Sequence, residues 1–176
     1  MKLVDNQSDF SDIGFMHRKY AAEICNFAAF EMANGKNMNT CITAQEQGYL
    51  ISMFRPNKNS AAVIATNKDY PSRAAFSILR EISNEYEQSG NSFIGGKSQV
   101  MKKAITDYQN PANADKILKI QENLAEAQKI MVMNLEQAIA RQESLSELAQ
   151  KSDRLSETSQ LFLRDTKKLN KCCSIL

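Results

Sequence analysis

The sequence predicts an α+β fold, in which a small antiparallel sheet with helices is followed by one long helix. Two observations predict this division. Three short segments rich in Thr, Ile, Val and aromatic residues lie between amphipathic helical patterns in the first half of the chain. All three prolines and all six glycines lie within the first 111 residues. Because Gly and Pro introduce turns, their absence after Pro111 predicts an uninterrupted helix.

The first predicted element is a helix over His17–Met32, with Gly35 placed to end it. Its apolar residues recur at helical intervals and comprise Ala21, Ile24, Phe27, Ala28 and Met32. Three antiparallel strands follow, separated by Gly, Pro and Asn, and they cover Asn39–Glu46, Gly48–Phe54 and Ala61–Thr66.

A second helix is predicted to begin at Asp69–Ser72, with Pro71 in its first turn, and to end at Gly90. Its buried stripe comprises Ala75, Leu79, Ile82 and Tyr86. The amphipathic stretch Val100–Tyr108 predicts a third helix, and a hinge follows at Asp107–Pro111. These elements together predict helices packed against a small sheet.

Composition and charge exclude several classes of function. The net charge is +2 and the basic residues are spread among carboxylates, so we expect no nucleic-acid partner. His17 is the single histidine and the four cysteines lack paired spacing, so we expect no metal, no cofactor and no catalytic site. The sequence shows no secretory leader and no apolar run long enough to span a bilayer. We therefore expect a cytosolic, reducing environment, with Cys25 and Cys41 as small buried apolar residues.

The second half carries a heptad pattern, in which apolar and small residues recur at alternating steps of three and four. This seam comprises Ile117, Ile120, Leu124, Ala127, Met131, Asn134, Ala138, Arg141, Leu145, Leu148, Ser152, Leu155, Ser159, Phe162, Thr166 and Leu169. A helix of this extent would be roughly 80 Å long, so its packing partners must lie outside a small domain. Small and polar seam positions would leave a homodimer poorly packed, and we expect a largely disordered segment until larger partner side chains fill those layers. Four apolar residues outside the seam favour a bundle of more than two helices: Ile130, Met133, Leu135 and Ile139.

Arg141 lies in the middle of the seam. A desolvated guanidinium there would cost several kcal/mol unless acceptors inside a bundle receive its five donors. Such a buried polar layer fixes register. The alternative is that the seam is approximate and Arg141 is a solvated charge on the helix surface.

The last four residues, Cys173–Leu176, fit the prenylation box, and the terminal Leu favours a geranylgeranyl group over farnesyl. This box implies a prenyltransferase as one partner and a lipid membrane, reached through prenyl or acyl chains, as another. Cys172 is a candidate for palmitoylation or a second prenyl group, since one chain alone binds membranes weakly. Nearby basic residues could add about 1 kcal/mol each on an anionic leaflet. These residues are Arg164, Lys167, Lys168 and Lys171.

Several seam residues resemble an R-SNARE series centred on its arginine: Asn134, Ala138, Arg141, Leu145, Leu148, Leu155, Phe162 and Leu169. The strands and the segment Asp69–Phe76 resemble a longin domain. Together with the Cys-Cys tail, these motifs resemble the YKT-type prenylated longin R-SNAREs of the synaptobrevin/VAMP-like superfamily, from about Ser8 to Leu176.

This resemblance implies a longin-like domain over residues 1–107, a linker over 108–115, an R-SNARE coiled-coil motif over 116–170 and a lipidation tail over 171–176. It implies vesicle membrane fusion through a four-helix bundle, with Arg141 in the central layer, hydrogen-bonded to glutamines of three Q-SNARE helices. The chain would cycle between the cytosol and the cytosolic face of Golgi, ER and endosomal vesicle membranes.

The resemblance also implies a closed state, in which the chain's own longin domain binds the SNARE segment and shields the lipid. The helix face that bears Ile24 and Phe27 would then be a clamp, and an ordinary helix-to-sheet core is the alternative for those two residues. Only Met1–Gln7 precede the first-helix region, whereas a longin domain begins with a β-hairpin. We therefore expect a truncated longin domain with three strands and one unpaired sheet edge.

Two further classes of function are open. A membrane-anchored coiled-coil scaffold or a non-fusogenic inhibitory SNARE would keep the anchor and the seam without the fusion role. A small GTPase is disfavoured, because Asn91–Ser98 only approximates a phosphate loop and follows a helix rather than a strand.

Overall fold

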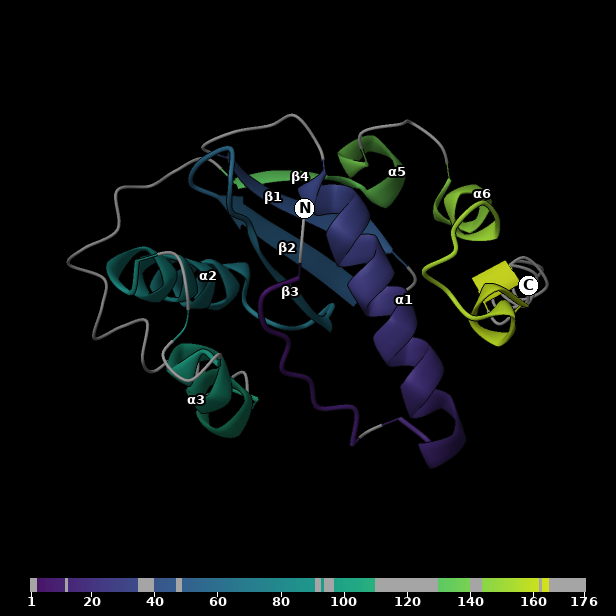
Figure 1. Ribbon diagram of the computed structural model, residues 1–176, viewed down its shortest axis with the longest axis horizontal. Coiled ribbons are helices and arrows are strands. Elements are labelled where there is room, and N and C mark those ends of the chain that lie inside the picture. Colours follow the sequence, from purple (N-terminus) through teal and green to yellow (C-terminus); the bar gives the residue numbers. More distant parts are fainter. Residues whose placement is uncertain are drawn as a thin grey trace.

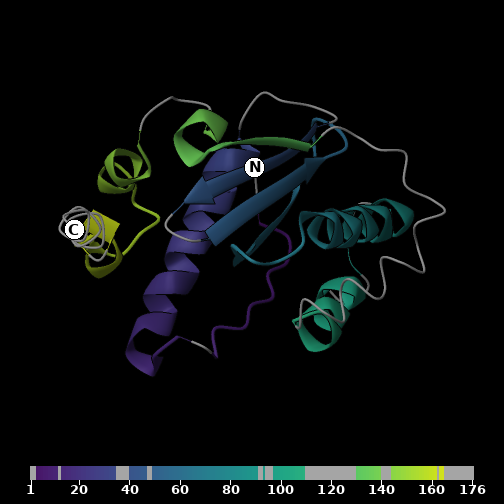
Figure 2. The same cartoon turned by 180° about the vertical axis from the view of Figure 1, so that it is seen from behind.

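The computed structural model of the chain describes residues 3–11, 13–34, 40–46, 49–90, 93, 97–109, 130–139, 144–161 and 163–164. A four-stranded sheet in the order β3-β2-β1-β4 lies between helices on its two faces (Figure 1). Helix α1 (Phe15–Ala33) packs on one face and α2 (Ser72–Gln88) on the other, as the view from behind also shows (Figure 2), and α3 (Gln99–Asp107) packs against α2. The predicted α+β class and all three predicted helices of the first half are confirmed.

Strands β1 (Thr40–Glu46), β2 (Tyr49–Arg55) and β3 (Ala62–Asn67) form the antiparallel meander that the sequence predicts. Ile42 and Met53 point from paired positions toward α1, while Phe54 points toward α2. The polar pair Thr43 and Ser52 is buried, and the two hydroxyl oxygens lie 3.0 Å apart, so each hydroxyl is satisfied by the other.

Strand β4 (Ile130–Asn134) departs from the predicted sheet, because it comes from the C-terminal segment and pairs in parallel with β1, from Cys41↔Ile130 to Gln45↔Asn134. The sheet is therefore mixed rather than antiparallel. A short apolar run can form a strand where it meets an open sheet edge, since the edge supplies backbone hydrogen bonds. The edge at β1 is thus covered, whereas β3 pairs only with β2 within the described part of the chain.

The second helix has the buried stripe that the sequence predicts, and it comprises Ala75, Leu79 and Ile82, with Tyr86 partly buried. Pro71 is the N-cap residue of α2 rather than a member of its first turn, and Gly90 follows the helix with a φ of 70°. Tyr70 precedes α2, and its hydroxyl donates to the backbone oxygen of Tyr108, the C-cap residue of α3, at 3.0 Å. Burial raises the pKa of Tyr70 to about 12.

Residues 3–11 connect the two helical layers. The Asp5 carboxylate accepts a hydrogen bond from the backbone N–H of Ser98 at 2.8 Å, at the start of α3. The Asn6 side chain donates to Asn26 of α1 at 2.9 Å. None of the helices within the described residues is long and apolar enough to cross a bilayer.

Candidate functional site

The C-terminal segment packs against the N-terminal domain instead of extending away from it (Figures 1 and 2). After β4 come the short helices α5 (Leu135–Ala138) and α6 (Leu145–Gln150), and residues 157–161 are also helical. The predicted uninterrupted helix is therefore not the conformation of residues 130–139 and 144–161 in this structure. We call residues 130–164 the docked segment.

Helix-capping side chains explain why the docked segment breaks into short helices. Ser144 begins α6 through a capping box: its backbone N–H donates to the Glu147 carboxylate at 2.9 Å, and its hydroxyl accepts from the Glu147 N–H at 3.3 Å. The Asn134 N–H donates to the Gln137 side chain at 3.2 Å before α5. The Ser156 hydroxyl accepts from the Ser159 N–H at 3.3 Å before residues 157–161. Each cap has an extended or non-helical backbone, which interrupts a continuous helix.

Most of the seam that falls within the described residues is turned toward the N-terminal domain. The buried seam residues are Ala138, Leu145, Leu148, Leu155 and Ser159. Ser152 is half-buried, and Met131 and Asn134 are exposed. The remaining predicted positions lie outside the described residues; they are Ile117, Ile120, Leu124, Ala127, Arg141, Phe162, Thr166, Leu169, Cys172 and Cys173.

The docked segment shares one apolar core with α1 and the sheet. Phe27 of α1 is 3% exposed and belongs to this core, and Ile24 is partly buried against it. Two apolar residues outside the heptad seam, Leu135 and Ile139, are almost fully buried in the same core. A two-helix seam does not explain why these two positions are apolar. Their burial in the core of the chain does. The same cluster contains residues of the sheet and of the docked segment, so the burial of Phe27 is compatible both with a clamp and with an ordinary helix-to-sheet core.

A polar contact fastens the end of the docked segment to α1. One Glu23 carboxylate oxygen accepts hydrogen bonds from the Ser156 hydroxyl at 2.7 Å, the Ser156 N–H at 3.2 Å and the Ser159 hydroxyl at 2.6 Å. These three residues are named the Glu23 latch. The hydrogen bond from Ser159, followed by that from Ser156, lowers the pKa of Glu23, because these donors stabilise the ionised carboxylate; Lys19 adds a smaller attraction.

Next to the latch, the Arg154 guanidinium lies 3.5 Å from the centre of the Phe30 ring. This distance is within the range of a cation–π interaction, which contributes about 0.5–1 kcal/mol at an exposed site. Sequence reasoning missed both Glu23 and Arg154, since each is one charged residue among many on a helical pattern. Ser156 and Ser159 have the spacing of an N-cap residue and the third residue of its helix, and this spacing could have predicted a helix start at the contact.

The segment that approximates a phosphate loop ends at a helix start occupied by a carboxylate. Glu85 of α2 accepts from the Gln99 N–H at 2.8 Å and from the Ser98 hydroxyl, at the first turn of α3. The first N–H groups of α3 therefore face a protein carboxylate, which repels a phosphate. No group of three or more His, Cys, Asp or Glu side chains within the described residues is arranged to hold a metal ion.

Comparison with known proteins gives the family. The synaptobrevin family model matches residues 116–175. The VAMP-like protein YKT61 of Arabidopsis thaliana is 33% identical over 182 residues, which cover 99% of this chain and 90% of that protein. The chain belongs to the YKT6 family of synaptobrevin homologues. The synaptobrevin homolog ykt6 of Schizosaccharomyces pombe is 29% identical over 99% of this chain and 92% of its own length. YKT6 of Saccharomyces cerevisiae is 29% identical over 96% of this chain and 88% of its own length.

The similarity to known proteins covers both the N-terminal domain and the docked segment. The synaptobrevin match includes the whole docked segment, so the residues that pack on α1 and β1 lie in the part of the chain that matches this family. The similarity to YKT61 extends over the N-terminal sheet and helices as well. The resemblance to YKT-type longin SNAREs that the sequence indicates is therefore confirmed.

Proposed function

We propose that this YKT6-family chain is an R-SNARE that mediates intracellular vesicle fusion and that its docked segment is the resting, closed form. What supports the proposal is the burial of five seam residues against the chain's own domain: Ala138, Leu145, Leu148, Leu155 and Ser159. The side chains that would line a four-helix bundle are thus occupied within the chain. Three Q-SNARE helices and the N-terminal domain would compete for the same face.

In the open form, the segment over residues 116–170 would become one helix and pair with the three Q-SNARE helices. Arg141 would lie in the central layer, where glutamines of the partner helices accept its hydrogen bonds. Phe27 and Ile24 would act as the clamp that holds the closed form, because they pack in the core that the docked segment shares.

Membrane attachment would come from a geranylgeranyl group on Cys173 and a second lipid on Cys172, with the chain cycling between the cytosol and Golgi, ER or endosomal membranes. The basic residues of the tail would strengthen this attachment on an anionic leaflet. Two bilayers would be drawn together as the bundle forms toward the lipidated end.

Mixing the purified chain with Q-SNARE helices tests this function. The expected result is a detergent-resistant complex with one copy of each of four helices, and Arg141→Leu should alter its register or its partner pairing. Nucleotide binding without such a complex would indicate a GTPase, and self-association alone would indicate a scaffold. A complex that forms equally well with Arg141→Leu, in unchanged register, would refute the central-layer assignment.

A further inference from the structure

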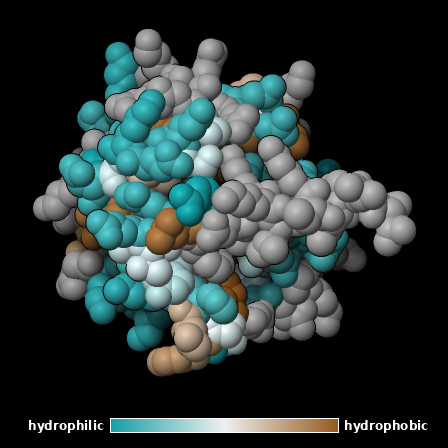
Figure 3. All heavy atoms as spheres, turned by 90° about the vertical axis from the view of Figure 1, so that its right-hand side faces the viewer, coloured by the Kyte–Doolittle hydropathy of each residue, from teal (hydrophilic) through white to brown (hydrophobic). Residues whose placement is uncertain are grey.

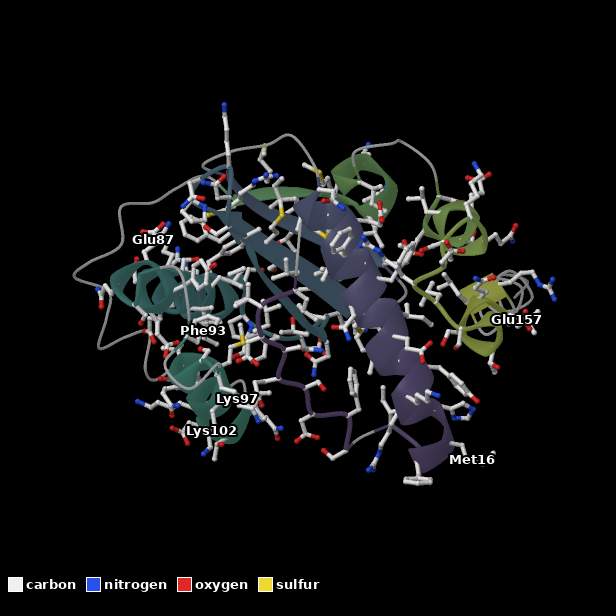
Figure 4. All side chains as sticks on the ribbon, in the orientation of Figure 1. Met16, Glu87, Phe93, Lys97, Lys102 and Glu157 are labelled. Atoms are coloured by element: carbon white, nitrogen blue, oxygen red, sulfur yellow. The ribbon has the colours of Figure 1, made fainter. Side chains whose placement is uncertain are left out.

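The start of α1 presents two adjacent large apolar side chains to the solvent. Phe15 is 85% exposed and Met16 is 79% exposed. Met16 lies at the end of α1 that projects past the sheet, away from the core (Figure 4). The space-filling view shows apolar side chains protruding at the lower edge of this face, where α1 begins (Figure 3). Single exposed apolar residues are common, whereas two adjacent ones at a projecting tip form a larger apolar surface that a partner can cover.

The tip is held in place rather than left to fray. The Arg18 guanidinium donates to the backbone oxygens of Ser11 and Ile13, each at 2.9 Å, and so ties the preceding turn to the helix. The His17 N–H donates to the Gly14 oxygen at 2.8 Å, which closes the first turn. Because these bonds fix the backbone at the start of α1, less backbone freedom is lost when Phe15 and Met16 bind, which lowers the entropic cost of binding.

Basic residues lie beside the apolar pair. Lys19 is exposed and follows Phe15 by four residues and Met16 by three, so it shares a helix face with both. Arg18, which directly precedes Lys19, is also exposed. The first turn of α1 contains no acidic residue. An apolar tip bordered by cations complements an anionic lipid surface, into which apolar groups insert while cations meet headgroups.

The end of the docked segment binds α1 near the helix start that carries Phe15 and Met16. Its serines bind Glu23, which is eight residues, or about 12 Å along the helix, from Phe15. Cys173 lies nine positions after Arg164, and this stretch can span at most about 30 Å. If Cys173 carries lipid, as the proposed function requires, the tip and the lipid can meet one bilayer.

We propose that Phe15 and Met16 form a membrane-insertion tip that binds the chain to anionic bilayers independently of its lipid groups. The tip would orient the N-terminal domain on the membrane with the start of α1 directed toward the lipid. Lys19 would add selectivity for anionic headgroups. A second contact of this kind would retain the chain on the membrane for longer than one lipid chain can, because two weak attachments must be broken together.

The experiment uses the full-length chain without lipid modification and vesicles of phosphatidylcholine, with or without phosphatidylserine, in a sedimentation assay. The double variant Phe15→Ser/Met16→Ser should bind both kinds of vesicle at least tenfold more weakly, because two large apolar side chains no longer enter the bilayer. Lys19→Gln should lose about fivefold on phosphatidylserine vesicles and little on phosphatidylcholine alone.

The matched control is Leu3→Ser/Val4→Ser, which removes two adjacent apolar side chains that are 63% and 50% exposed on the segment near α3. It should bind vesicles as the unaltered chain does. Equal binding by Phe15→Ser/Met16→Ser and the unaltered chain, or no vesicle binding by the unaltered chain, overturns the inference. So does an unaltered chain that is dimeric by light scattering and becomes monomeric in this variant, because the tip would then bind a second copy.

Thermal unfolding verifies that Phe15→Ser/Met16→Ser still folds. Failure of the inference is separable from failure of the proposed function, since vesicle binding is measured without Q-SNARE helices. A chain that binds vesicles through the tip but forms no complex with Q-SNARE helices would refute the proposed function and leave the inference intact.

Discussion

The Glu23 latch offers a direct test of what holds the docked segment. Glu23→Gln keeps the length of the side chain and its helix propensity but removes the negative charge. Hydrogen bonds to charged groups contribute about 1.5–3 kcal/mol each, whereas neutral ones contribute about 0.5–1.5 kcal/mol. Three such bonds reach one Glu23 oxygen, and Ser156 is exposed to water, which weakens its share. We therefore expect the docked state to lose about 1–2 kcal/mol, or roughly tenfold in its population ratio.

Hydrogen–deuterium exchange measures this loss region by region. Backbone amides in residues 144–161 should exchange about tenfold faster in Glu23→Gln, while those of α2, on the other face of the sheet, should keep their protection. The control is Glu31→Gln, which makes the same charge change two turns further along α1. Glu31→Gln should unfold at nearly the same temperature as the unaltered chain, whereas Glu23→Gln should unfold a few degrees lower, because its docked native state is less stable.

A double-mutant cycle isolates the pairwise contribution. Ser159 is fully buried, so Ser159→Ala alone should also destabilise the docked segment. If the two groups interact as the structure indicates, the combined variant should cost about 1 kcal/mol less than the sum of the single changes. Strictly additive effects, or unchanged exchange in Glu23→Gln, would show that the latch does not hold the segment.

Three further outcomes follow from the described contacts. The latch lowers the pKa of Glu23, so its contribution to the stability of the docked segment is present at neutral pH and should be lost as the pH falls below the ordinary value of 4.5. Proteolysis of the docked segment in the unaltered chain should accelerate over that pH range. In Glu23→Gln, which lacks the titrating carboxylate, the fall in pH should cause no such acceleration. Leu148→Ala should remove about 2–5 kcal/mol of packing and release α6 to fast exchange, whereas Val132→Ala, at a side chain 71% exposed, should change exchange little. Gly90→Ala should lower unfolding stability by about 1 kcal/mol, measured by thermal denaturation, because an alanine is strained at a φ of 70°; Gly90→Asn should cost less.

The elements of the N-terminal domain could be predicted because their signals are local. The spacing of Phe27, Ala28 and Met32 follows the helical period, and their burial is what that period predicts. Gly90 ends α2 through its positive φ, as a glycine after a helix commonly does. Pairing within the meander follows from short turns between neighbouring strands.

The conformation of the docked segment could not be predicted in the same way, because its sequence carries two patterns. The heptad seam and the absence of Gly and Pro favour one long helix, whereas Ser144 and Glu147 have the spacing of a capping box, which favours a helix that begins at residue 145. Strand β4 depends on an open edge 89 residues earlier, at Cys41↔Ile130, which no local window contains. The contact between Glu23 and Ser156 spans 133 residues for the same reason.

Undocking would move the seam residues from the core of the chain into a helical bundle, so the difference in their free energy between the two states decides which state is favoured. Leu145, Leu148 and Leu155 are buried here and would be buried again in a bundle, so their apolar area contributes to both states. Ser159 differs, because its hydroxyl is satisfied by Glu23 in the docked form, whereas a serine fills a bundle layer poorly. Small polar seam residues thus favour the docked form and large ones are nearly neutral. A ligand that contacts both states equally would leave their ratio unchanged, so a partner must supply the difference in free energy through contacts made only in the bundle, such as those of the proposed central layer at Arg141.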